Sequence, residues 1–232
     1  MVKTSLQIAI LATAAWAGTA HAVVVAQWDF EAAVAPVAST SWTGIAASTG
    51  SASASASGVH AGSATWTTPV GNGSTKSASA NTWAIGDYWQ FNFSTSGYTA
   101  LAISFDQTSS GTGPRDFTLA YSTNGISFTN FSNYSLLQNA APAWTGASYA
   151  PAYNLTLNLS GVTALDNQTS VFVRLFNTSS VSASGGTVAN GGASRIDNFT
   201  VNMTLIPEPG TYALLLAGLA VIGFVARRRV QA

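Results

Sequence analysis

The chain has no cysteine and very little charge: 8 of its 232 residues are lysine or arginine and 8 are aspartate or glutamate. Without cysteine, no disulfide can help to hold the fold of an exported protein. Residues 23–205 carry four cations against seven carboxylates, a net charge of −3. Nucleic-acid binding needs a cluster of cations to displace counterions, so this class of function is excluded.

Histidine is equally scarce, because beyond residue 22 the chain has only His60, beside a Ser/Ala-rich stretch. A His pair for a transition metal is therefore missing, and no G-x-S-x-G elbow presents a serine for a catalytic triad. We expect no enzyme. The alternative is a polysaccharide-active hydrolase or lyase that uses an Asp/Glu pair. The candidates for such a pair are Asp29, Glu31, Asp87, Asp106, Asp116, Asp166 and Asp197.

The first 22 residues have the layout of a secretory signal peptide. Lys3 supplies the positive n-region, residues 6–17 the apolar core, and Ala20-His21-Ala22 a small-residue cleavage site. Cleavage after Ala22 would start the mature chain at residue 23 and would mark the protein as exported.

Residues 23–205 show no helical apolar period and indicate short strands instead. Residues 198–205 and 153–160 alternate strictly between apolar and polar side chains, and Asn124-Gly125 between two such runs is typical of a hairpin. Eight or more strands separated by Gly/Ser/Asn turns predict an all-β fold, an antiparallel β-sandwich of jelly-roll type. An up-and-down barrel is the alternative.

Residues 40–80 differ from the rest of this domain because they contain the low-complexity runs SASASAS and GNGSTKSASAN. Such runs bury little apolar surface and cost conformational entropy to order. We expect a long, partly mobile insert or a weak edge hairpin over these residues.

The last residues, 206–232, combine a Pro-Glu-Pro triplet, an apolar run and three arginines. Residues 212–226 carry no charge, and with residues 210 and 211 they predict a single transmembrane helix over 210–226, although the length is marginal for a bilayer. Arg227, Arg228 and Arg229 directly behind it predict a cytoplasmic C-terminus and a body on the far side of the membrane. Two prolines keep residues 207–209 extended and open to a protease.

These features together resemble the PEP-CTERM sorting signal of Gram-negative bacteria. The resemblance implies recognition by an exosortase-type membrane protease, processing near Pro207, Glu208 and Pro209, and transient anchoring in the inner membrane with a periplasmic body. Delivery to the cell surface or the extracellular polysaccharide matrix would follow.

The runs FTLAYSTNGISF, VFVRLF and GGASRIDNFTV also resemble carbohydrate-binding jelly-roll domains, in which a structural calcium ion is common. The resemblance implies Asp29, Glu31 and Asp197 as calcium ligands, and carboxylate oxygens suit this hard cation. Pairing of Asp197 with Arg195 or Arg174 is the alternative role for this carboxylate.

Four aromatic residues lie in Gly/Ser/Thr/Pro-rich loops and are candidates for stacking on sugar rings: Trp42, Trp66, Trp144 and Tyr149. Trp28, Trp83 and Trp89 lie in or beside strand patterns and are assigned to the core. Packing within the protein is the alternative for the loop tryptophans too. The sequence thus predicts an exported, structural or adhesive surface or matrix protein with weak glycan binding. A module that binds another surface protein is a further hypothesis.

Overall fold

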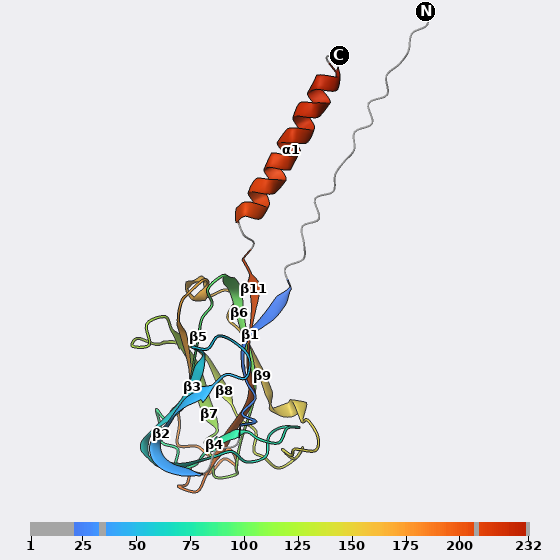
Figure 1. Ribbon diagram of the computed structural model, residues 1–232. Helices are drawn as coiled ribbons and strands as arrows, with labels where there is room; N and C mark the ends of the chain where they lie inside the picture. Colours follow the sequence, from blue (N-terminus) through green and yellow to red (C-terminus); the bar gives the residue numbers. More distant parts are fainter. Residues whose placement is uncertain (1–20, 33–35, 207–208, 231–232) are drawn as a thin grey trace, which may run out of the picture.

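The body of the protein is built from antiparallel strands joined by turns, as the alternating sequence predicts (Figure 1). The computed structural model describes residues 21–32, 36–206 and 209–230. The strands in these residues are β1 (Ala22–Trp28), β2 (Val37–Ala46), β3 (Ser55–Thr67), β4 (Ala78–Ala80), β5 (Tyr88–Phe93), β6 (Tyr98–Ser109), β7 (Asp116–Ser122), β8 (Thr129–Ser135), β9 (Asn154–Asn158), β10 (Val171–Asn177) and β11 (Ser194–Leu205). Short 3₁₀ turns at Pro151–Tyr153 and Thr163–Leu165 and the helix α1 (Pro209–Val230) are also present.

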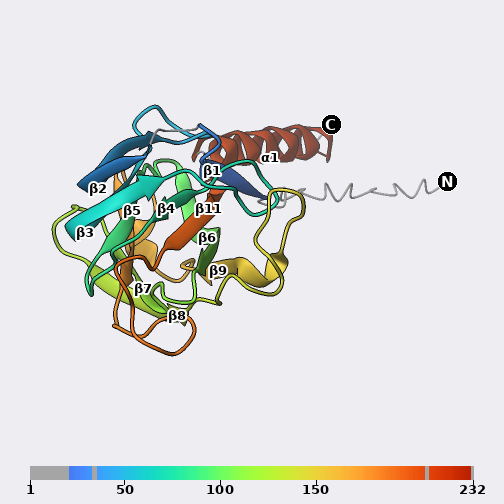
Figure 2. The ribbon, with the colours of Figure 1, turned by 90° about the horizontal axis from the view of Figure 1, so that it is seen from below.

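Hydrogen bonds link the strands in the order β8-β7-β10-β5-β3-β4-β11-β6-β9, with β1 paired to β11 and β2 to β3. β3 meets β4 only through Trp66 and Thr67, and at this narrow junction the sheet folds over. The half with β5, β10 and β7 then packs against the half with β11, β6 and β9 (Figure 2). Among the described residues the end strands β8 and β9 do not pair with each other, so the fold is a jelly-roll-like sandwich and not a closed barrel.

An aromatic core fills the space between the two halves. Phe91 of β5 lies parallel to Phe199 of β11, with ring centroids 3.5 Å apart and planes inclined by 3°. Trp28 of β1 meets both rings edge-on, at 5.1 and 5.8 Å. Strand alternation puts these side chains on the inner faces, where their burial contributes to the apolar driving force for folding. The assignment of Trp28, Trp83 and Trp89 to the core is confirmed.

The low-complexity stretch forms strands, and β2 and β3 pair as an antiparallel hairpin, the second of the two forms expected over residues 40–80. The mobility expected for an insert stays a prediction. β3 lies inside the sheet, between β2 on one side and β5 on the other, so only β2 is at an edge. The Ser/Ala alternation is a strand pattern with very small side chains, in which Ala56 and Gly58 face inward. Position 58 needs a glycine because the rings of Trp66 and Trp89 occupy the space that a side chain would fill.

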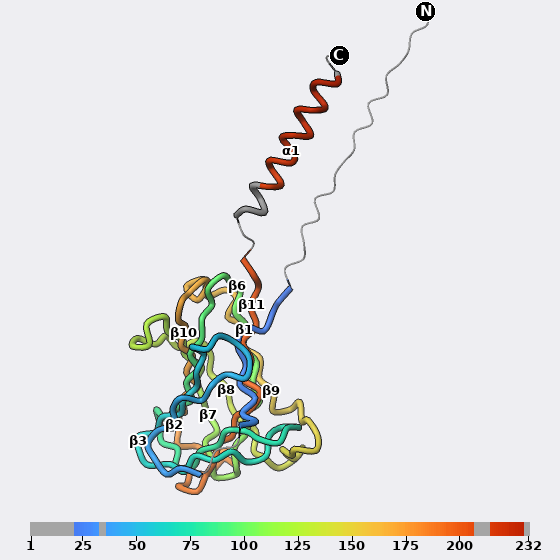
Figure 3. The backbone as a smooth tube through the Cα atoms, viewed as in Figure 1, coloured from blue at the N-terminus to red at the C-terminus, as the bar shows by residue number. Residues whose placement is uncertain are grey.

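Both ends of the body lie at the same end of the sandwich (Figures 1 and 3). Ala22, the first residue of β1, pairs with Thr204 near the end of β11. The N–H of Ile206 donates to the carbonyl of Gly97 at 2.9 Å. The sandwich therefore begins at the expected signal-cleavage site and is complete directly before the Pro-Glu-Pro triplet.

The helix predicted over 210–226 is present as α1, and Arg227, Arg228 and Arg229 form its last turn. Within the part of the chain that the structure describes, no helix is long and apolar enough to cross a membrane. The transmembrane assignment is therefore not supported. Residues 1–20, which include Ala20 of the cleavage site, and Pro207 and Glu208 lie outside the described residues.

Candidate functional site

The outer face of β5, β10 and β7 carries aromatic side chains beside its polar ones. The solvent-facing side of an antiparallel sheet ordinarily carries polar side chains. Along β10 the residues Val171, Val173 and Leu175 point into the core. The alternate positions Phe172, Arg174 and Phe176 therefore lie on the outer face, and each is half-buried. Both faces of this strand are rich in apolar atoms, which is unusual for the exposed side of an antiparallel sheet.

The strand register places a row of residues side by side across this outer face. Gln90 of β5 pairs with Arg174 of β10, which pairs with Ala120 of β7, and Ala120 pairs with Asn130 of β8. The next row brings Tyr88 of β5 beside Phe176 of β10. Because Ala120 has a small side chain, the sheet is hollowed next to Arg174.

Arg174 is held by two aromatic rings and one amide. Its guanidinium carbon lies 4.2 Å from the ring centroid of Tyr88 and 3.8 Å from that of Phe128, which belongs to the loop between β7 and β8. Its Nε donates to Oε1 of Gln90 at 2.8 Å. Loss of solvent lowers the pKa of Arg174, opposed by the Tyr88 hydroxyl, but an arginine keeps its charge at neutral pH.

These side chains surround a surface hollow with a volume of about 250 Å³. Its lining comes from β5, β7, β8, β10 and the segments directly before β5 and β8. The residues are Gly86, Tyr88, Ala120, Phe128, Asn130, Arg174 and Phe176. Arg174 is the only charged residue among them. An aromatic wall with a few polar groups is suited to a ligand that has both apolar faces and hydroxyl edges, as a sugar has.

The tryptophans proposed from the sequence for stacking on sugar are placed elsewhere. Trp66 and Trp144 are only 1% and 3% exposed, so the prediction that they stack on a glycan is wrong. Their indole N–H groups donate inside the protein, to the carbonyls of Ser39 and Val70 at 3.0 and 2.9 Å. Trp42 is half-buried and packs against the core, with its ring 6.5 Å from Trp66.

Tyr149 is the exposed member of this set, with 52% of its surface accessible. Its hydroxyl donates to Oδ1 of Asp106 at 3.3 Å, on the opposite half of the sandwich from the Arg174 hollow. The four residues therefore form no common surface, and stacking by Tyr149 alone stays a prediction.

Of the three carboxylates predicted to bind calcium, Glu31 and Asp197 converge on the loop that precedes β4. Oδ2 of Asp197 accepts from the N–H of Asn72 at 2.9 Å and from the Ser74 hydroxyl at 2.7 Å. Glu31 accepts from Thr75 Oγ1 and from the N–H of Lys76. Oxygen-rich surroundings of this kind fit the ligand preference of calcium.

Asp29 does not join them, because its Oδ1 accepts the N–H of Glu31 at 3.2 Å in a local turn. Among the described residues no three acidic or histidine side chains lie close enough to hold a metal ion. The three-carboxylate calcium site is therefore not assembled, and calcium binding stays a prediction that rests on Glu31 and Asp197 alone. Asp197 forms no ion pair with a described arginine, so the alternative pairing with Arg195 or Arg174 is wrong.

Asp197 of β11 pairs directly with Asp106 of β6, and a bulge in β11 follows this pair. The register shifts between Asp197 and Thr200, and Asn198 adopts a φ of 51°, so its amide reaches Oδ2 of Asp106 at 2.9 Å. Both carboxylates are buried, and burial raises the pKa of Asp197 to about 6 against the three hydrogen bonds that lower it. Neither carboxylate lines the Arg174 hollow, where a substrate could enter.

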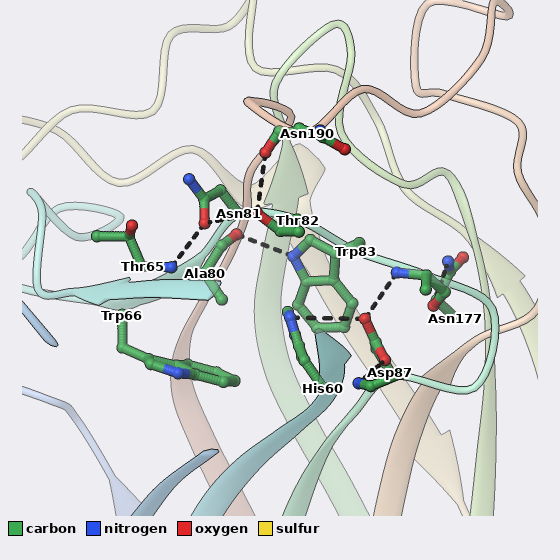
Figure 4. A network of polar contacts seen from close by, with 12 residues as sticks. His60, Thr65, Trp66, Ala80, Asn81, Thr82, Trp83, Asp87, Asn177 and Asn190 are labelled. Carbon is green, nitrogen blue, oxygen red and sulfur yellow. Dashed lines mark hydrogen bonds and ion pairs between the residues drawn. The ribbon is translucent and has the colours of Figure 1, made fainter. Parts of the chain in front are cut away.

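His60 belongs to β3, and its side chain lies between the indole rings of Trp66 and Trp83 (Figure 4). Its ring centroid is 4.6 Å from that of Trp66 and 4.3 Å from that of Trp83. Its Nδ1 is 3.5 Å from Oδ2 of Asp87, whose two oxygens also accept the N–H groups of Ala61 and Ala84. Burial lowers the pKa of His60 more than the charge of Asp87 raises it. With 0% of its side chain exposed, this histidine has no access to a substrate.

Comparison with known proteins identifies a PEP-CTERM protein-sorting motif at residues 205–229. No curated protein matches the chain.

Solved structures with a similar fold include carbohydrate-binding modules. The CBM22-2 xylan-binding domain of Paenibacillus barcinonensis is 10% identical, with a TM-score of 0.43 over 77% of this chain and 98% of that one. A xylanase fragment of Clostridium thermocellum, with CBM22-1 and GH10 modules, is 11% identical, with a TM-score of 0.43 over 77% of this chain and 28% of that one. A cleaved adhesin domain of Lys-gingipain from Porphyromonas gingivalis is 11% identical, with a TM-score of 0.37 over 77% and 98% of the two chains.

Proposed function

We propose that this is an exported, non-enzymatic protein of the cell surface or exopolysaccharide matrix, delivered by exosortase-type processing at its Pro-Glu-Pro triplet. The observation that carries the proposal is the PEP-CTERM motif at residues 205–229. The end of the sandwich supports it, because β11 stops at Leu205 and the last backbone bond of the body comes from Ile206. Cleavage after these residues would release the body with its hydrogen-bonded sheet complete.

The N-terminal end supports the same route. β1 is paired with the last residues of β11, so a cut behind Ala22 would remove one residue of β1 and leave Val23 paired with Met203. Two processing events at one end of the sandwich would leave the opposite end and both sheet faces untouched.

The test of this route is the intact mass and location of the protein in its native cell, beside a Pro207-Glu208-Pro209→Ala-Ala-Ala variant. We expect the wild-type protein to lose both terminal segments and to reach the surface or matrix, whereas the variant keeps Arg227 to Arg229 and stays cell-associated. A wild-type mass that retains these arginines, unchanged by the substitution, would contradict the proposal.

For the body, we propose polysaccharide binding at the hollow beside Arg174, as the activity of a structural or adhesive protein. The supporting observation is that Tyr88, Phe128 and Phe176 gather on a solvent-facing sheet surface, where they leave a hollow of about 250 Å³. Aromatic rings there can stack on the apolar faces of sugars while Gln90 and Asn130 supply polar groups at their edges.

Replacement of Phe128 by alanine should weaken binding to polysaccharide about tenfold, since an aromatic contact contributes about 0.5–1.5 kcal/mol beyond its area. The matched control is Phe131→Ala, because Phe131 is exposed on the neighbouring strand β8 and does not line the hollow. Affinity electrophoresis against a panel of plant and bacterial polysaccharides would measure both. Equal retardation of the two variants would argue against this surface.

The alternative of a hydrolase or lyase would need a carboxylate pair in an open cleft with the substrate between its members. Asp106 and Asp197 lie near each other but are 1% and 0% exposed, and their oxygens accept hydrogen bonds from Asn154, Asn198, Asn72 and Ser74. This geometry favours a structural role for the pair.

A further inference from the structure

Arg174 is a partly buried cation without an anionic partner among the residues that the structure describes. It is half-buried on the outer face of β10, and no described carboxylate lies within ion-pair distance of it. By contrast, Arg115 on the same half of the sandwich pairs with Asp116 at 2.9 Å. A charge removed from water without a partner is costly, so such a residue commonly marks a place where a partner arrives from outside.

The contacts of Arg174 leave its terminal amino groups free for a ligand. Nε is engaged with Gln90, and the rings of Tyr88 and Phe128 lie over the guanidinium carbon. Nη1 and Nη2 make no hydrogen bond to a described residue, and neither is a buried atom without a partner, so both are accessible to solvent on a side chain that lines the hollow. The rings restrict the rotation of the side chain and thus pre-organise its planar fork.

We propose that the Arg174 hollow binds the carboxylate of a uronic acid unit, so that the ligand of this face is an acidic polysaccharide. This inference rests on the proposed polysaccharide binding and specifies its chemical class. A guanidinium and a carboxylate are both planar and form two parallel charge-assisted hydrogen bonds, a match that a neutral sugar cannot offer. The rings of Tyr88 and Phe128 lie beside the charge, where the pyranose ring that carries the carboxylate would sit.

The rest of the hollow fits a single charged group surrounded by hydroxyls. Arg174 is the only charged residue in the lining, while Gln90 and Asn130 stand on either side of it in the same cross-strand row. The body as a whole has a net charge of −3, so no long-range attraction draws a polyanion to it. Recognition therefore depends on local contact with Arg174 and not on a general positive field.

The experiment compares equilibrium binding of the purified protein to galacturonan, to neutral galactan and to sulfated galactan at 0.15 M salt. We expect the wild-type protein to bind galacturonan at least tenfold more tightly than galactan. Arg174→Gln should remove this preference, because the amide carries no charge to pair with the carboxylate. Arg174→Lys should restore only part of it, because an ammonium lacks the planar fork.

Lys76→Gln is the matched control, because it removes the same charge from a side chain outside the hollow and should leave the preference unchanged. Thermal melts confirm that each variant is folded. Equal affinity of the wild type for galacturonan and galactan would overturn the acidic class while the proposed polysaccharide binding stands. Tighter binding of sulfated galactan than of galacturonan would replace the uronate by a sulfate ester. Binding to none of the three would remove both the inference and the polysaccharide-binding proposal for this face.

Discussion

Substitution of Gly58 by valine should unfold the protein at temperatures where the wild type is stable, with a loss of about 3 kcal/mol in the free energy of unfolding. A Cβ atom at this position would lie 2.2 and 2.5 Å from carbons of the Trp66 ring and 3.0 Å from Trp89. Both indoles are buried and are themselves in edge contact at 5.4 Å, so neither can move aside without displacing other core rings. Urea denaturation followed by tryptophan fluorescence would measure the loss.

The same strand supplies the control. Gly62 is exposed on β3, and a Cβ atom there would meet nothing within 4 Å. Gly62→Ala should change the stability by no more than about 0.5 kcal/mol, and in the stabilising direction, because alanine loses less entropy in a strand. Gly58→Ala should lie between the two. If Gly58→Val were as stable as Gly62→Ala, the close packing of β3 against the two indoles would be refuted.

This dependence on small residues explains why the sequence did not place β3 inside the sheet. An alternation of serine and alanine has the period of a strand but almost no hydrophobic contrast, so composition predicted a partly mobile insert or a weak edge hairpin. The contrast is supplied by large rings, since Trp66 near the end of the same strand and Trp89 of β5 fill the volume next to Gly58. The signal that indicated a strand in this stretch was the strict period of two, which holds although the side chains are small.

The strongly alternating segments were predicted correctly because their signal is local. Residues 198–205 form the last part of β11, and β9 lies within residues 153–160. The Asn124-Gly125 turn joins β7 and β8, with Oδ1 of Asn124 accepting the N–H groups of Ile126 and Ser127 at 2.9 Å. The sorting motif at residues 205–229 could also be read directly, because it is a contiguous pattern.

The candidate site could not be derived in the same way, because it depends on strand pairing between distant segments. Gln90, Arg174, Ala120 and Asn130 form one row only after four strands take their register. The burial of Trp66 and Trp144 is likewise nonlocal, since their N–H partners lie 27 and 74 residues away. One local hint existed in the sequence of β10. Apolar residues occupy both faces of this strand, with a single arginine among them, whereas a strand with one solvent-facing side ordinarily carries polar residues on that side.

The second large effect is an acid-dependent loss of stability that originates at His60. Burial between Trp66 and Trp83 lowers the pKa of this histidine below its ordinary value, so the folded protein binds a proton less readily than the unfolded chain. Well above pH 6.5 His60 is neutral in both states and contributes no pH dependence. As the pH falls below about 6.5, the unfolded chain gains the proton first, and stability declines by up to about 1.4 kcal/mol per pH unit until the folded-state pKa is reached.

Asp197 acts with the opposite sign over part of this range. Burial raises its pKa to about 6, so the folded protein binds a proton more readily than the unfolded chain and gains stability as the pH falls through that value. The contribution of His60 therefore has to be measured as the difference in the free energy of unfolding between the wild type and a His60 variant. Asp87 is the charged group that faces the imidazole of His60. The indoles of Trp66 and Trp83 enclose this imidazole (Figure 4).

His60→Phe and His60→Gln provide that difference, because both remove the titrating group and the first also keeps an aromatic ring between the indoles. We expect the free energy of unfolding of the wild type, minus that of either variant, to fall between pH 7 and pH 5, as measured by urea denaturation at several pH values. A difference that stays constant over this range would show that His60 titrates alike in the folded and unfolded states. The aromatic enclosure would then fail to exclude the protonated form, contrary to the buried geometry.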